Sequence, residues 1–206
     1  MRYISLFLAS LPLIGQSLPY ESSRGASYHQ TDSISARYGR CAEGKRPDFP
    51  NMTFSLFEDP VKLVKGRMSK TETEDGHFLG SVSVDLVSVH PLPHGDGRER
   101  YWLVLLFVES VGGSTSQSYT AQVFRCGNGE LRVVQQIAWD ARTSPRKSPV
   151  SIDLQTGDLR FATSHYQPGD AHCCVSAQDE VSYDWRGGRY RLEKVVARRL
   201  QDGERP

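Results

Sequence analysis

The stretch that decides the fold is Tyr101 to Val108, which reads YWLVLLFV. Successive side chains of a strand point to opposite sides, so a strand that is apolar at every position is covered on both faces. The run is also too short to cross a membrane as a helix, which takes about 20 apolar residues. We therefore expect Tyr101 to Val108 to form the buried central strand of a sheet.

Further strands and their turns flank this run on both sides. Before it, residues 81–89 read SVSVDLVSV and mostly alternate between apolar and polar side chains. After it, residues 119–125 and 131–138 flank Cys126-Gly127-Asn128-Gly129, in which Asn-Gly supplies the positive φ values of a tight hairpin. The sequence therefore predicts antiparallel neighbours for the central strand.

Two more hairpins are expected in the C-terminal third. Residues 151–154 and 159–162 flank a QTGD turn, and residues 181–185 and 189–196 flank Arg186-Gly187-Gly188. About nine strands at close spacing, without a convincing helical period, predict an all-β fold that is mostly antiparallel, built as a meander or a curled sheet. At most a short basic helix over Leu192–Leu200 is expected.

The N-terminus has the pattern of a secretory signal peptide. Met1-Arg2 gives a positive start, Tyr3 to Ile14 is mostly apolar, and Gly15-Gln16-Ser17 offers small residues for cleavage. We expect residues 1–17 to be removed on export, leaving a periplasmic or secreted protein without a membrane span. A buried N-terminal strand and a signal anchor are the alternatives.

The rest of the chain divides by composition. Residues 18–50 are rich in Ser, Gly, Arg and Tyr without a sustained apolar period, so we expect a flexible N-terminal arm. Residues 51–200 are expected to form a single β-rich domain, and residues 201–206 a polar tail. One domain of this length can bury a real core.

The charge balance excludes some partners. The 206 residues include 25 Lys and Arg against 24 Asp and Glu, for a net charge of +1. This balance gives no electrostatic reason to expect nucleic acid. The absence of any run of five basic residues argues against polybasic attachment to anionic lipid.

The cysteines are Cys41, Cys126, Cys173 and Cys174. An even number in an exported protein favours disulfides, and four cysteines allow three connectivities. We expect Cys173 and Cys174 to bond separate partners, Cys41 and Cys126, because a bond between adjacent cysteines closes a strained ring. Which of the two adjacent cysteines takes which partner stays open.

The segment HYQPGDAHCC, His165 to Cys174, has the side chains for chemistry. His165 and His172 with both sulfurs could ligate zinc, although adjacent cysteines direct their sulfurs poorly at one ion. Cys173 or Cys174 could also act as a nucleophile beside a histidine. A loop held by disulfides is the favoured interpretation, and we expect no metal, catalytic residue or cofactor.

Aromatic residues gather in the C-terminal quarter, where Tyr166, Tyr183, Trp185 and Tyr190 could form a face that binds a sugar or a protein. Cross-strand aromatic pairs also stabilise hairpins, and this structural role is the favoured interpretation. The stretch HGDGRE, His94 to Glu99, has too few carboxylates for a calcium loop and is expected to be a turn.

In order along the chain, these pieces resemble a family of uncharacterised exported bacterial proteins. That family has a GDG turn, an apolar strand ending in Gly-Gly, and a CC(P)S segment before a YxWxG hairpin. The matching stretches are Val61–Gly66, Gly95–Gly97, Leu103–Gly113, Val123–Arg125, Asp170–Ser176 and Tyr183–Gly188.

This chain departs from the family at two places. Its turn has lost carboxylates, and Val175 replaces the usual Pro after the cysteine pair. The resemblance implies export and a β architecture, and it brings no established activity.

The function we expect is a noncatalytic binding or structural role at or outside the cell envelope, with an envelope or extracellular ligand. The alternative is a cysteine- or histidine-dependent enzyme, or a metal-binding protein, that uses the His165–Cys174 segment.

Overall fold

The computed structural model describes residues 28–32, 34, 36–42, 45–56, 60–93, 99–112, 114–141, 150–167, 170 and 176–200. It confirms the all-β fold, with antiparallel pairing throughout these residues. The single helical element in this part of the chain is the 3-10 turn Phe49–Asn51. No helix in the described part is long and apolar enough to cross a membrane.

The strands form a large sheet, a small sheet and one short hairpin. The large sheet has the order β1-β9-β8-β7-β6-β5, with β2 also paired to β9. Its strands are β1 (Tyr28–Thr31), β2 (Arg37–Arg40), β5 (Arg67–Glu74), β6 (His77–Leu92), β7 (Arg100–Gly112), β8 (Ser114–Gly127) and β9 (Glu130–Asp140). The small sheet has the order β10 (Ser151–Ile152), β11 (Leu159–His165), β12 (Ala177–Arg186) and β13 (Arg189–Arg199). The short hairpin pairs β3 (Thr53–Ser55) with β4 (Pro60–Lys62).

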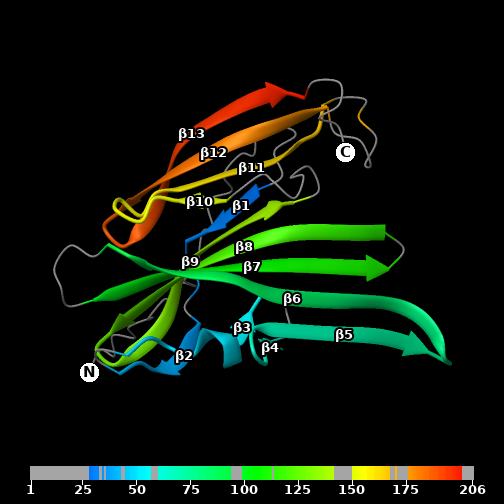
Figure 1. The fold of residues 1–206 in the computed structure, drawn as a ribbon, viewed down its shortest axis with the longest axis horizontal. Coiled ribbons are helices and arrows are strands. Elements are labelled where there is room, and N and C mark those ends of the chain that lie inside the picture. Colours follow the sequence, from blue (N-terminus) through cyan, green and yellow to red (C-terminus); the bar gives the residue numbers. More distant parts are fainter. Residues whose placement is uncertain are drawn as a thin grey trace, which may run out of the picture.

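The large sheet lies between two layers (Figure 1). On β7, Trp102, Val104 and Leu106 face a core shared with the β3–β4 hairpin. Their neighbours Leu103 and Leu105 face a second core, shared with the small sheet. The doubly apolar run of β7 is therefore the buried central strand that its sequence predicts, because each set of side chains has its own core to enter.

Both cores are rich in aromatic rings. In the first, Phe49 packs edge to face against Phe124 with ring centroids 5.1 Å apart. In the second, Trp139 of the large sheet stacks on Phe161 of the small sheet with centroids 4.0 Å apart. These contacts join each outer layer to the central sheet and add to the free energy of apolar burial.

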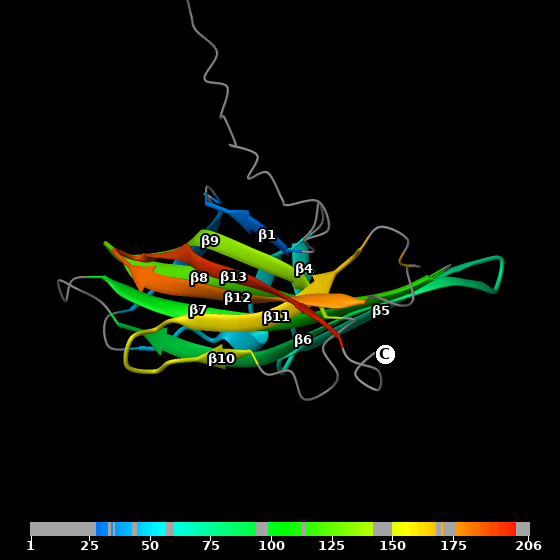
Figure 2. The ribbon, with the colours of Figure 1, turned by 90° about the horizontal axis from the view of Figure 1, so that it is seen from above.

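The predicted hairpins form where expected. Asn128 and Gly129 have φ values of 53° and 75° between β8 and β9, as a two-residue turn requires. A hairpin that the sequence analysis missed joins β5 to β6 through Asp75 and Gly76, whose φ values are 49° and 79°. Figure 2 shows this hairpin extending past the end of the small sheet.

The expected C-terminal helix is wrong. Residues 192–199 continue β13, which pairs with β12 as far as Arg199 opposite Ala177. The ladder pairs the backbone groups of this segment that face β12, and tertiary pairing of this kind overrides a weak helical preference.

The expected flexible arm is corrected over its second half. Within residues 18–50, β1 and β2 both pair with β9 on the same edge of the large sheet. Tyr28 and Phe49 are buried in the two cores, which gives the segment apolar anchors despite its polar composition. The expected signal peptide (1–17) and polar tail (201–206) lie outside the described residues.

Candidate functional site

The first site is the disulfide, which joins Cys41 to Cys126 with their Cα atoms 6.0 Å apart. This pairing overturns the expected bonds from Cys173 and Cys174 to these two residues. The reason is that β2 lies beside β9, next to the end of β8 that carries Cys126, and Cys41 N donates a hydrogen bond to Gly129 O at 3.0 Å. Cys173 and Cys174 lie outside the described residues.

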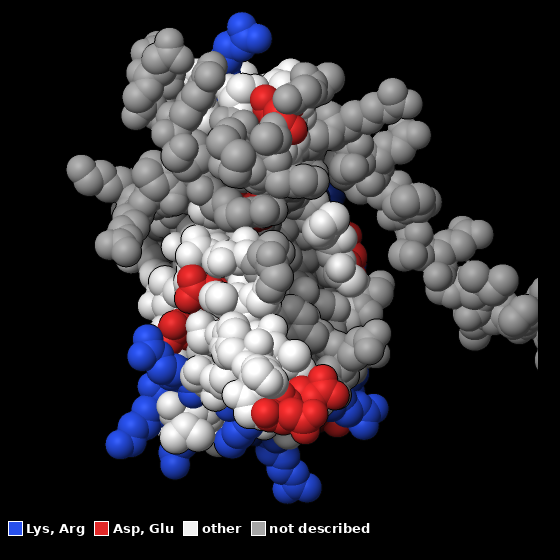
Figure 3. All heavy atoms as spheres, turned by 90° about the vertical axis from the view of Figure 1, so that its right-hand side faces the viewer, with Lys and Arg blue, Asp and Glu red and all other residues white. Residues whose placement is uncertain are grey.

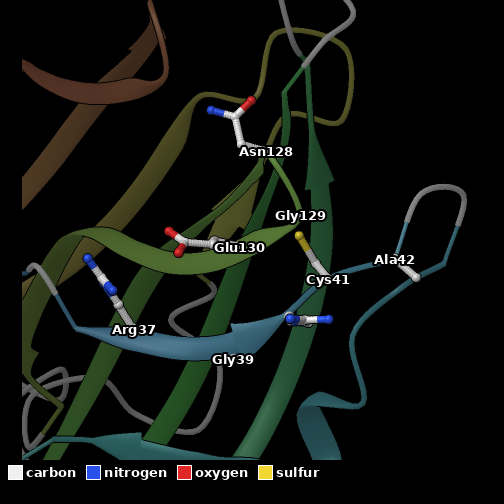
Figure 4. A pocket seen from close by; sticks show the side chains of 8 residues that line it. Arg37, Gly39, Cys41, Ala42, Asn128, Gly129 and Glu130 are labelled. Carbon is white, nitrogen blue, oxygen red and sulfur yellow. The ribbon is translucent and has the colours of Figure 1, made fainter.

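A pocket of about 790 Å³ opens beside this disulfide (Figure 4). Arg37 and Arg40 give it positive charge, and Arg132 with Arg37 holds the pKa of Glu130 below its usual range. The lining residues are Arg37, Gly39, Arg40, Cys41, Ala42, Asn128, Gly129 and Glu130. Because most of these residues are small or highly exposed, the pocket offers a ligand little buried surface.

The second site is a histidine–carboxylate pair between the end of β11 and the neighbouring strand β12. His165 Nδ1 lies 3.0 Å from both carboxylate oxygens of Asp179, whose side chain is 1% exposed. A carboxylate at Nδ1 orients an imidazole, as in catalytic triads. No hydrogen bond joins Nε2 of this histidine to a described residue, so the described part of the chain shows an oriented histidine without a nucleophile.

Asp170 connects Gln167, which follows β11, to Ser176, which precedes β12. Its Oδ2 accepts hydrogen bonds from Gln167 N at 2.8 Å and from Ser176 N and Oγ at 3.0 Å. The zinc and nucleophile candidates His172, Cys173 and Cys174 lie outside the described residues, as does the turn at residues 94–98. Within the described ranges, no three His, Cys, Asp or Glu side chains are placed to hold a metal ion.

The aromatic face expected from Tyr166, Tyr183, Trp185 and Tyr190 is corrected. Tyr183 and Tyr190 are 1% exposed and belong to the core between the two sheets. They point inward because the small sheet turns this face of β12 and β13 toward the large sheet. Tyr166, which follows β11, and Trp185 are half-buried.

Trp185 has the structural role that the hairpin interpretation predicts. It lies opposite Tyr190 in the β12–β13 register with ring centroids 5.1 Å apart, and it packs edge to face on Tyr101 at 5.3 Å. Its indole N–H donates to Pro93 O at 2.6 Å. Burial, with a hydrogen bond to Glu99, raises the pKa of Tyr101 to about 12, so this hydroxyl stays protonated.

A third site lies on the large sheet, on the side that faces the small sheet and at the margin of the second core, against which Tyr119 packs. Asp85, Phe107 and Tyr119 are register partners on β6, β7 and β8, and the row continues to the buried Trp139. The next row toward the strand ends is polar, with Ser83, Glu109 and Gln117 in register. We call these two rows the platform, defined by Ser83, Asp85, Phe107, Glu109, Gln117 and Tyr119.

The platform side chains hold one another in place. Phe107 packs on Tyr119 with centroids 5.2 Å apart, and Tyr119 stacks on Trp139 at 5.6 Å. Gln117 Nε2 donates to Glu109 Oε1 at 2.7 Å. All six members are half-buried, so each keeps part of its surface for a ligand.

Neither the platform nor Asp179 was predicted from the sequence. A usable signal exists after the apolar run, where Glu109 and Ser110 and then residues 115–118, TSQS, are polar at successive positions. Polar side chains on both faces of a strand indicate that it continues beyond its core.

No family model, no curated protein and no solved structure matches this chain.

Proposed function

We propose that this protein is an exported, noncatalytic binding domain, and that its ligand is a carbohydrate chain that lies on the platform. The observation that carries the proposal is the pair of rows on β6, β7 and β8, in which aromatic rings lie beside a carboxylate–amide pair. The Cys41–Cys126 disulfide is compatible with export, because disulfides persist in oxidising compartments.

The chemistry of the platform suits sugars. The apolar faces of sugar rings pack on aromatic side chains such as Phe107 and Tyr119. Sugar hydroxyls both donate and accept hydrogen bonds. Glu109, Gln117 and Asp85, whose Oδ1 also accepts from Arg67 Nε, supply acceptors and amide donors. Adjacent strands lie about 4.8 Å apart and side chains repeat along one face about every 6.8 Å, so the groups form a regular array.

Rigid strands also favour a binding role. The platform residues sit within ladders that fix their backbones, so a ligand would order few side chains on binding. Because few side chains lose conformational freedom, less of the binding free energy is lost to ordering, and a small contact area can suffice for binding.

The test is retention of the purified protein on polysaccharides. The probes are peptidoglycan sacculi, chitin, cellulose and soluble mannan, measured by co-sedimentation and affinity electrophoresis. We expect the wild type to bind at least one probe and the Glu109→Ala/Gln117→Ala variant to bind it about tenfold more weakly, the loss of about 1.4 kcal/mol.

Ser110→Ala/Ser118→Ala is the matched control, since these neighbours lie on the same strands but on the opposite face. It should bind as the wild type does. Circular dichroism checks that both variants fold. Failure of the wild type to bind any probe, or equal binding by the platform variant, would overturn the proposal.

A further inference from the structure

The large sheet ends in an open edge. β5 is the last strand of its path, and residues 69–74 are all exposed. The strand contains no proline and reads RMSKTETE from Arg67 to Glu74. An exposed edge of this length is a template for a further strand, which natural proteins otherwise block with proline, bulges or unpaired charge.

The hydrogen bonds at the start of β5 show which backbone groups face outward. Leu86 N donates to Gly66 O at 2.7 Å, so this pair is hydrogen-bonded across the two strands. The following pair, Arg67 and Asp85, is therefore a non-hydrogen-bonded pair. In agreement, Arg67 N donates to Val64 O and Arg67 O accepts from Val64 N. Antiparallel ladders alternate between the two kinds. The register shift between Glu72 and Thr73 places its extra residue, Leu79, on β6, so the alternation along β5 itself continues. The backbone groups of Ser69, Thr71 and Thr73 therefore point away from β6.

The side chains between these positions carry opposite charges. Lys70 and Glu72 lie on the same face of β5, with Nζ and Oε1 2.9 Å apart and side chains 67% and 59% exposed. Lysine on an edge usually discourages pairing, but here a carboxylate two residues away offsets its charge. Figure 3 faces the end of this hairpin and shows acidic side chains gathered beside basic ones; exposed Glu72, Glu74 and Asp75 belong to this end.

We infer that β5 pairs antiparallel with β5 of a second copy of this chain, with Thr71 on the two-fold axis. Thr71 then lies opposite its own equivalent, and Ser69 lies opposite Thr73 on each side. All the outward-facing backbone groups of the three residues are used, since each such pair exchanges two hydrogen bonds.

The charges select this register. With Thr71 on the axis, Lys70 of each copy lies opposite Glu72 of the other, in the closer, non-hydrogen-bonded kind of pair. Moving the axis by one residue places Lys70 opposite Lys70, or Glu72 opposite Glu72, and like charges directly opposite destabilise a sheet. Self-complementarity therefore points to a second copy rather than a foreign strand.

The pairing has a consequence for the shape of the assembly. A two-fold axis perpendicular to the sheet keeps the same face of both copies on the same side. The two large sheets become one continuous sheet, and the platforms of both copies face the same direction. This inference does not depend on what the platform binds.

Sedimentation velocity of the full chain, from about 1 µM to about 1 mM, tests the pairing. We expect the wild type to dimerise within this range and Lys70→Glu to weaken the dimer about tenfold, because both attractive pairs become repulsive. The double swap Lys70→Glu/Glu72→Lys restores the attraction and should return the dimer to within about threefold of the wild type.

A backbone variant tests the same register independently. Thr71→Pro removes an outward N–H that does not bond to β6, so the monomer should keep its fold while the dimer is lost. Thr71→Val is its matched control and should dimerise as the wild type does. A wild type that is monomeric throughout the range, or a swap that fails to restore dimers, would overturn the inference.

Discussion

Removing the Cys41–Cys126 disulfide should cost this protein a large part of its stability. The bond closes a loop with a sequence separation of 85 residues. In the chain-entropy model such a loop stabilises the folded state by about 4.6 kcal/mol at 25 °C. Because a domain is typically stable by about 5–15 kcal/mol, the Cys41→Ala/Cys126→Ala variant should unfold at a much lower urea concentration than the wild type.

The structure also predicts which segment opens first when the disulfide is removed. Cys41 follows β2, and Arg100 Nη2 donates to Ala42 O at 2.6 Å, so the cross-link and this hydrogen bond hold the N-terminal segment against the large sheet. Without the bond, cleavage by a protease near residues 37–42 should precede global unfolding, because local opening needs less free energy than complete unfolding.

Cys173→Ala/Cys174→Ala is the informative comparison. Under the connectivity in the structure, this variant leaves the stabilising loop closed and should unfold near the wild-type midpoint. If each adjacent cysteine were bonded to Cys41 or Cys126, both double variants would remove the same two bridges and lose equal stability. Equal losses in urea unfolding, or native alkylation of Cys41, would refute the reasoning.

Three smaller perturbations test the remaining structural assignments. Trp185→Ala should lower the free energy of unfolding by about 3 kcal/mol, measured in urea, and a fully stable variant would contradict its packing role. His165→Ala leaves the Asp179 carboxylate buried without its partner and should cost about 3 kcal/mol; adding Asp179→Asn should recover part of this loss, which a purely catalytic pair would not show. Burial, and secondarily Arg46, lower the pKa of His90 below 6.5. The unfolded state therefore binds this proton more tightly than the folded state does, so the free energy of unfolding falls as the pH drops from 6.5 toward the folded-state pKa. NMR titration should show the low pKa, and Arg46→Gln should raise it.

The sequence predicted the centre of the fold because burial leaves a pattern there. β7 is apolar on both faces since it has a core on each side, and the Asn128-Gly129 turn needs positive φ values that few other residues adopt. β5 left no such pattern. Its exposed side chains are charged or hydroxylated on both faces, so only Asp75-Gly76 marked the hairpin.

The candidate sites were harder to predict because they depend on which strands meet. Tyrosines occur both in exposed binding faces and in cores, so the sequence alone does not tell which of these Tyr183 and Tyr190 belong to. The packing of the small sheet on the large one buries them. The disulfide connectivity likewise follows from the pairing of β2 with β9, a contact distant in sequence that a polar arm does not indicate. Asp179 could not be linked to His165 before β11 and β12 were known to pair.

The extension of the large sheet beyond its covering layers argues for interaction at that end. Ordering a residue costs about 1–2 kcal/mol of backbone entropy, and a strand usually offsets this by apolar burial. Residues 69–79 of the β5–β6 hairpin are all exposed, and Phe78 and Leu79 near its turn are 57% and 53% exposed. A second copy at β5 would supply backbone pairing for this edge, and a ligand on the platform would cover the adjoining half-buried rings. Both proposed contacts therefore lie at the exposed end of the large sheet, and they use different atoms. The second copy would pair with the outward backbone of Ser69, Thr71 and Thr73, whereas the ligand would contact side chains of β6, β7 and β8.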